Sequence, residues 1–227
     1  SQQVYLPFWG CAFHEQFKAD AAIMAKMAPG TQLVFLYLYY AENTGSVNLT
    51  QIAKALSLSK ATCTRAINDL SASGLISQTA EGTNKWITTA YTKSELLEKA
   101  YGRLKTPVDR ILYVKGTAQI EHPIASGIRA LARQSMIGVN DQDGAIAISK
   151  KEAAKIPAED ICTKQYFEDF GGAVIEVWSY DPIILERDGC VDDISLLLSM
   201  DNDPNERVQT CLDEIRQKHG LPIKEEE

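Results

Sequence analysis

Hydrophobic residues in the first part of the chain recur with the spacing of helices. Apolar positions follow one another every three or four residues across 14–27, which predicts an amphipathic helix there. Residues 32–41 are apolar on nearly every side, so a helix over this stretch is expected to lie at the centre of a core. Thr31, directly before it, is the predicted N-cap residue.

Two short amphipathic helices separated by a tight turn are predicted next. Asn48 begins the first, and Gln51 three residues later completes a capping-box pattern. Ser59 begins the second helix, over 60–72, and Gly74 follows its end, where glycine commonly closes a helix. The inner face of this second helix is predicted to consist of Ala61 or Thr62 together with Cys63, Ala66, Ile67 and Leu70.

The pattern then changes to short runs of strand-forming residues. Residues 75–79 and 85–89 are rich in such residues and are joined by a short loop, which predicts a hairpin. A further helix is expected over 92–104, begun by Thr92 with Glu95 completing its capping box. The order of helix, helix, turn, helix and two-stranded hairpin predicts a winged helix-turn-helix.

The second half of the chain has the pattern of a mixed α/β domain. The pattern predicts strands at 109–116, 144–149 and 172–180, and helices at 122–136, 191–200 and 203–220. The fold class predicted for the chain is therefore α+β, with a winged helix-turn-helix domain followed by a smaller acidic mixed α/β domain. We place the boundary so that the domains are 1–115 and 116–227.

Charge is distributed unequally between these two halves. The 227-residue chain has a net charge of −7. Residues 1–115 hold 12 Lys and Arg against 8 Asp and Glu, whereas residues 116–227 hold 11 against 22. The halves therefore carry +4 and −11, which indicates two domains with different roles. The first half suits an anionic partner, and DNA would repel the second.

The helical motif and hairpin resemble a known family. Residues 47–76 resemble the helix-turn-helix of bacterial transcription regulators, and residues 31–104 resemble a MarR-type winged-helix domain. The matching features are the small Ala53, Leu58 and Ser59 at the turn, and "ATCTRAINDL…GLI" as recognition helix and entry to the wing. The resemblance implies a cytoplasmic prokaryotic transcription regulator, not an enzyme, that binds double-stranded DNA as a homodimer without a cofactor.

The predicted recognition helix, at 59–72, carries side chains that suit DNA. Ser59 and Lys60 lie at the positive end of the helix dipole, where a phosphate is favoured. Arginine pairs bidentately with guanine and asparagine with adenine, so Arg65 and Asn68 are candidates for reading bases. With the wing at 75–89, the predicted DNA-binding residues are Ser59, Lys60, Thr62, Thr64, Arg65, Asn68, Lys54 and Lys85.

The sequence departs from this family pattern at two places. Ser57 stands in the turn where many relatives have glycine, because that position often needs a positive φ. The wing carries a single cation, Lys85, against Glu81, whereas MarR-type wings usually display arginine. We therefore expect a slightly altered or strained turn and a wing with a lesser part in binding.

Other roles stay open at this stage. The motif is also compatible with a protein-interaction module, such as an antitoxin-like protein that binds a partner, and with an enzyme whose winged helix positions a nucleic acid. The acidic half is expected to bind an effector or a protein partner, or to dimerise. No metal site is predicted, because Asp-rich 141–144 and 201–206 lack a complete calcium-loop pattern and the three histidines are scattered.

Two further expectations concern the surroundings of the protein. The longest apolar run, 33–41, is far shorter than the roughly 20 residues of a membrane-spanning helix, so no membrane span or signal peptide is expected. The five cysteines lack C-x-x-C spacing and are odd in number, which favours reduced thiols that pack as small apolar residues.

Overall fold

The chain divides into two compact units. The computed structural model describes residues 25–41, 47–81, 84–116, 119–135 and 144–223. Residues 1–104 form the first unit and residues 105–227 form the second. The helix predicted over 14–27 lies almost entirely outside the described residues. We had placed the boundary after residue 115, but strand β4 (Val108–Val114) pairs within the second unit's sheet.

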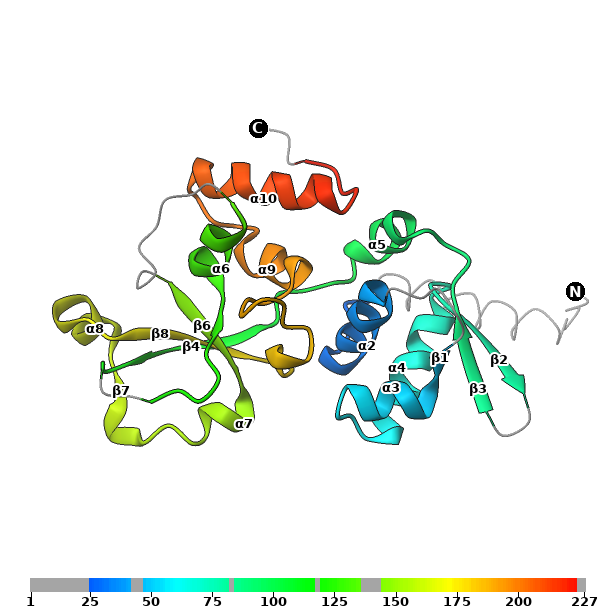
Figure 1. Cartoon of the computed structure of the whole chain (residues 1–227), viewed down its shortest axis with the longest axis horizontal. Coiled ribbons are helices and arrows are strands. Elements are labelled where there is room, and N and C mark those ends of the chain that lie inside the picture. The colour runs from blue at the N-terminus through cyan, green and yellow to red at the C-terminus, as the bar shows by residue number, and fades with distance from the viewer. Residues whose placement is uncertain (1–24, 42–46, 82–83, 117–118, 136–143, 224–227) are drawn as a thin grey trace, which may run out of the picture. The chain divides into compact units, whose positions relative to one another are not determined.

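The first unit combines helices with a small sheet, as the pattern predicted. Its described helices are α2 (Pro29–Tyr40), α3 (Leu49–Ala55), α4 (Lys60–Ala72) and α5 (Lys93–Tyr101). Its strands are β1 (Val47–Asn48), β2 (Ser77–Glu81) and β3 (Asn84–Thr88), in the order β1-β3-β2. The long β2–β3 hairpin extends from one end of the helices (Figure 1). The predicted α+β class and hairpin are confirmed.

Helix α2 begins three residues earlier than its predicted cap implied. Ala28 is the N-cap residue, Pro29 occupies the first turn, and Thr31 is a buried residue inside the helix. The Thr31 cap was therefore wrong. Proline has its φ already set for a helix, and a first-turn residue needs no backbone N–H, so Pro29 starts the helix without a side-chain cap. The expectation that α2 is central holds, since Leu33, Val34 and Leu36 are buried.

The helix-turn-helix itself follows the sequence closely. Asn48 and Gln51 form the predicted capping box of α3, and the Ser59 side chain caps α4. Between the two helices Ser57 has a φ of +52°. The turn thus keeps the left-handed backbone conformation that glycine usually supplies, and serine adopts this conformation at a cost in free energy. Gly74, with a φ of +71°, closes α4 as predicted.

The second unit is built on a five-stranded sheet. Its strands are β4, β5 (Ile124–Ala125), β6 (Ala145–Ser149), β7 (Ile161–Cys162) and β8 (Ala173–Trp178), in the order β5-β6-β8-β4-β7. Its α-helices are α6 (Gly127–Gln134), α7 (Lys150–Ala153), α8 (Lys164–Phe170), α9 (Asp193–Met200) and α10 (Glu206–Lys218). Strands β6 and β8 are parallel, and the other pairs are antiparallel.

The two faces of this sheet are covered differently. Helix α7 packs on one face, where Val114, Ile146, Ile175 and Val177 form a core with Ala153. Helices α6 and α9 lie over the other face, and α10 packs on both of them (Figure 1). The second face therefore lies under helices rather than against a second sheet, and it carries the cavity discussed below.

Two predicted helices in the second unit begin later than expected. The helix predicted over 122–136 starts only at Gly127, because Ile124 and Ala125 instead pair with β6 as an edge strand. Gly127 has a φ of +54°, which breaks the chain direction between strand and helix. In α10 the N-cap is Asn205, so Pro204 precedes the helix instead of occupying its first turn. The short α7, α8 and β7 were not predicted.

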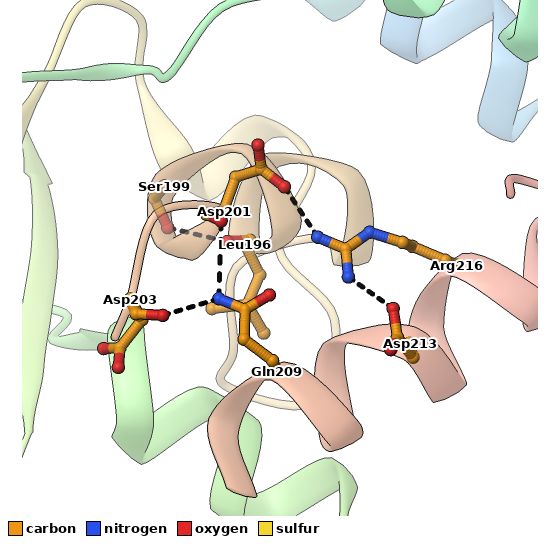
Figure 2. Close-up of polar contacts among 7 residues, drawn as sticks. All are labelled: Leu196, Ser199, Asp201, Asp203, Gln209, Asp213 and Arg216. Atoms are coloured by element: carbon orange, nitrogen blue, oxygen red, sulfur yellow. Dashed lines mark hydrogen bonds and ion pairs between the residues drawn. The ribbon is translucent and has the colours of Figure 1, made fainter. Parts of the chain in front are cut away.

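A buried arginine holds the last two helices together. Arg216 on α10 donates to Asp201 at 2.6 Å and to Asp213 at 2.5 Å, and only 3% of its side chain is exposed. Figure 2 shows the guanidinium between the two carboxylates, with Gln209 donating to the turn that follows α9. These two carboxylates raise the pKa of Arg216 against the opposing effect of burial. The contacts fix the turn between α9 and α10.

Candidate nucleic-acid interface

The outer face of α4 is a narrow exposed stripe. Cys63, Ala66, Ile67 and Leu70 are buried, as predicted. The exposed residues on the opposite side recur every three or four positions and are Ala61, Arg65, Asn68 and Ala72. Ala61, which we had considered for the inner face, is therefore exposed. The stripe combines two polar side chains with two small ones.

At the start of α4, the Ser59 hydroxyl is already hydrogen-bonded, whereas the Lys60 ammonium is exposed. The Ser59 side chain accepts the Thr62 backbone N–H at 3.1 Å and lies 2.9 Å from the Thr62 hydroxyl. Its oxygen is thus engaged in capping. Lys60, the next residue, is exposed and has no acidic partner among the described residues. Lys60 thus adds a positive charge near the positive end of the helix dipole, which suits a phosphate.

The two threonines of the predicted set do not lie on the stripe. Thr62 is half-buried, and its methyl group would lie 2.9 Å from a Cβ added to Gly30, so it packs against the start of α2. Thr64 is half-buried and donates its hydroxyl hydrogen to the Lys60 carbonyl at 2.8 Å. Both hydroxyls therefore have partners within the first unit.

Arg65 and Asn68 both lie on the stripe, and Asn68 links it to the hairpin. Arg65 donates from Nε to the Ala61 carbonyl at 3.4 Å, which leaves the forked end of the guanidinium directed outward. Asn68 accepts a hydrogen bond of 3.4 Å from Gln78 on β2. Gln78, which sequence reasoning missed, thus connects α4 to the hairpin, and its amide also donates to the Ile67 carbonyl at 3.5 Å.

The remaining two predicted residues are placed with different detail. Lys54 is exposed near the C-terminal end of α3, shortly before the loop that connects α3 to α4. Lys85 lies on β3 opposite Ala80, but its side chain is outside the described part. The structure therefore gathers Lys60, Arg65 and Asn68 on α4 with Lys54 nearby in sequence.

One protein-family model matches part of the first unit. Residues 31–85 match the MarR family model. The predicted resemblance is confirmed for this segment, which runs from α2 to β3, whereas α5 lies beyond it. No curated protein matches the chain, and no solved structure matches it. The match covers part of the first unit and supports a winged-helix segment of the kind found in MarR-type DNA-binding regulators.

An ion pair between a buried arginine and a partly exposed aspartate joins α4 to the segment that follows α5. Arg103, at the end of α5, donates to both carboxylate oxygens of Asp69 on α4 at 3.0 and 3.1 Å. It also donates to the Ala25 carbonyl at 2.9 Å, and only 5% of its side chain is exposed. Sequence reasoning missed this pair, because its members are distant in sequence. The only local signal was one arginine within the apolar end of a helix.

Cys63 packs on the inner face of α4. Its side chain is fully buried, and the thiol approaches the Leu49 carbonyl at 3.7 Å. Burial raises the pKa of the thiol, so it stays protonated and unreactive at neutral pH.

The described residues contain no group of three metal-binding side chains. None of the described helices is long and apolar enough to cross a membrane.

Proposed function

We propose that the first unit binds double-stranded DNA in a sequence-specific manner and regulates transcription in a prokaryotic cytoplasm. The exposed stripe on α4 supports this proposal, because the small residues Ala61 and Ala72 flank Arg65 and Asn68 there. Small side chains allow a helix to approach base edges closely, and the two polar ones suit guanine and adenine. The matched family is the second support.

The proposed roles differ among the eight predicted residues. Arg65 and Asn68 read bases from the major groove. Lys60 and Lys54 contact phosphates, and Lys85 joins them from the wing, at about 75–89. Ser59, Thr62 and Thr64 hold the first turns of α4 in shape, which is a narrower role than direct DNA contact. Ala61 and Ala72 are added as positions that allow close approach.

Fluorescence anisotropy with labelled duplexes tests this proposal. The full chain is titrated onto its own upstream genomic fragment and onto a random duplex across a salt series. Arg65→Ala should remove the preference for the genomic fragment, whereas Lys60→Glu should weaken both complexes and change the salt slope. Arg207→Ala and Lys151→Glu, at exposed sites of the second unit, are matched controls. Equal loss in the controls and the test variants would contradict the assignment.

We further propose that the regulator is a homodimer that joins through the second unit. Among the described residues the exposed large hydrophobic side chains all belong to that unit, and Phe170 is 74% exposed. Tyr166 and Ile161 extend this surface over α8 and β7. An exposed apolar surface of this kind suits the self-complementary contact between two identical copies.

Sedimentation analysis of the full chain tests the dimer. Phe170→Ser should raise the dimer dissociation constant, whereas Glu168→Gln on the same helix should leave it nearly unchanged. A dimer that survives Phe170→Ser undiminished would contradict the proposed seam. The half-sites of the DNA should then be spaced by about one helical turn.

A second candidate function is a protein-interaction module, such as an antitoxin-like protein. The observation that favours it is the weakly basic first unit, with Arg65 as the only cation on the exposed stripe of α4. In this case α8 would contact a different protein, and DNA binding would be secondary or absent. A monomeric chain that binds no duplex at low salt would favour this function over the first.

The second unit is proposed to act on the first through a bound effector or partner. Its support is the acidic composition of a well-packed unit that DNA would repel.

A further inference from the structure

The second unit contains a cavity on the helix-covered face of its sheet. The cavity has a volume of about 690 Å³, which is within the range of small-molecule sites. Its floor is formed by Ala145, Val174 and Glu176 from β6 and β8, and the apolar side chains of Ile128 and Met200 line it from α6 and α9. It therefore lies between the sheet and two helices.

Strand register explains why these side chains share one space. Val174 is paired with Ala145 in the parallel ladder, so their side chains point to the same face. Glu176 follows two residues after Val174 and therefore also points there, whereas Ile175 and Val177 point to the opposite core. A cavity on this face thus receives a carboxyl group from the middle of a central strand.

The Glu176 carboxyl is unusual because it is held in largely apolar surroundings. Trp178 donates its indole N–H to one carboxyl oxygen at 3.0 Å. The other oxygen lies 3.6 Å from the point that a Cβ on Gly127 would occupy, so glycine leaves space directly beside it. Burial raises the pKa of Glu176, against the opposing effects of the Trp178 indole and the Ser126 hydroxyl. A cationic ligand would restore the charged form.

The other ionisable group of the cavity is also acidic. Asp203, in the turn after α9, lines the rim beside Asn202, and one of its carboxylate oxygens accepts the Asn205 backbone N–H at 2.9 Å. Figure 2 shows Asp203 held at this turn next to the Gln209 amide. Among the described lining residues there is no lysine, arginine or histidine. The electrostatic environment therefore favours cations and disfavours anions.

We propose that this cavity binds a small organic cation, in which a protonated amine pairs with Glu176 and an apolar body contacts Ile128, Val174 and Met200. Asp203 adds attraction at the rim. A bare metal ion fits less well, because the described residues offer no cluster of three ligands. The proposal rests on the effector role of the second unit, and ligand binding is measured separately from DNA binding.

Calorimetry on the full chain tests the site with three defined probes. Benzylammonium is titrated at pH 8, with benzyl alcohol and benzoate as neutral and anionic analogues of the same size. Benzylammonium should bind, benzyl alcohol should bind more weakly, and benzoate should not bind. Benzoate binding as strong as benzylammonium binding, or no binding of the cation at millimolar concentration, would overturn the proposal.

Variants assign the binding to the proposed carboxyl. Glu176→Gln keeps the size and the acceptor for Trp178 but removes the charge, and it should weaken benzylammonium by about tenfold or more. Asp203→Asn should weaken it less, and Glu168→Gln, on the exposed side of α8, should have no effect. Unchanged affinity in Glu176→Gln, with an unchanged circular dichroism spectrum, would overturn the proposal.

The pH dependence and the DNA complex give two further readouts. Affinity should rise with pH as Glu176 ionises and should lose this dependence in Glu176→Gln. Anisotropy of the DNA complex is then measured with and without benzylammonium. If the cation binds but the chain binds no DNA, the site stands and the proposed regulator function fails. If DNA binds normally but the cation does not, the site fails alone.

Discussion

Helices α4 and α10 are each 13 residues long, yet their charged residues serve opposite purposes. On α4, Lys60 and Arg65 are exposed and have no acidic partner among the described residues. On α10, Arg216 and Lys218 are paired with acids of the same unit. Charge that is already paired contributes little to a partner, so α4 presents Lys60 and Arg65 outward, whereas α10 uses Arg216 and Lys218 for contacts within its own unit. The observed units carry net charges of +2 and −9.

The largest expected effect comes from breaking the arginine cluster of α10. Arg216→Ala leaves Asp201 and Asp213 unpaired, and these two carboxylates are partly exposed. We expect a loss of about 2–3 kcal/mol in the free energy of unfolding of the second unit, below the usual range for a fully buried pair. Urea denaturation followed by tryptophan fluorescence measures it. Arg207→Ala on the same helix, at an exposed position, should change stability by less than about 0.5 kcal/mol.

The second-largest effect is expected at Arg103, a cation of the first unit that is paired with an acid. Arg103→Met removes the ion pair that holds Asp69 of α4, although Arg103 is not a proposed DNA contact. We expect a loss of about 2 kcal/mol in stability, because Asp69 and the Ala25 carbonyl lose their donor. DNA affinity should fall as well, through misplacement of α4. Glu98→Gln, exposed on α5, is the control, and an equal effect there would mean that the pair has no positioning role.

Asp193, which pairs with Lys218 and His219 at the end of α10, should make the stability of the second unit fall at low pH. Burial opposes ionisation of Asp193, but hydrogen bonds from His219 and Lys218 prevail and lower its pKa to about 2. A depressed carboxyl pKa gives stability above the unfolded pKa of about 4, which is lost as pH falls toward 2. We expect this loss to be about 1 kcal/mol, because solvent screens the partly exposed pair. Denaturation at pH 6 and pH 3 should show it in wild type, and Asp193→Asn should abolish it.

The smallest effect concerns the turn before α4. Ser57→Gly should raise stability by about 0.5–1 kcal/mol, because glycine adopts the φ of +52° without strain. A shift in the thermal midpoint measures it. Ser71→Gly, inside α4, is the matched control and should lower stability, since glycine is unfavourable within a helix. A destabilising Ser57→Gly change would contradict the strain.

The sequence predicted those features that depend on residues close together in the chain. The capping boxes of Asn48 with Gln51 and of Thr92 with Glu95 lie within one turn, so the residue types reveal them directly. Long-range features were not accessible in this way. The Asp69–Arg103 pair and the edge strand at Ile124–Ala125 depend on tertiary pairing. For the same reason the cavity around Glu176 was missed, since it follows from the register of β6 with β8.

The candidate interface was predicted in outline but not in detail. Residue types and helical spacing placed Lys60, Arg65 and Asn68 on the exposed side of α4. The same spacing could not show that Thr62 packs against the start of α2, because that contact joins two helices. Nor could it show that the Thr64 hydroxyl bonds to the Lys60 carbonyl, whereas the engagement of the Ser59 hydroxyl follows from its predicted role as the cap of α4.

The most direct measurement is anisotropy of the full chain on genomic and random duplexes, with Arg65→Ala beside Arg207→Ala. Both variants remove one exposed arginine, one from α4 and one from α10. If α4 reads DNA, only Arg65→Ala should lose the genomic preference, by about 1–3 kcal/mol of discrimination. If both variants retain that preference, or wild type binds neither duplex at low salt, the central assignment of α4 as a recognition helix is contradicted.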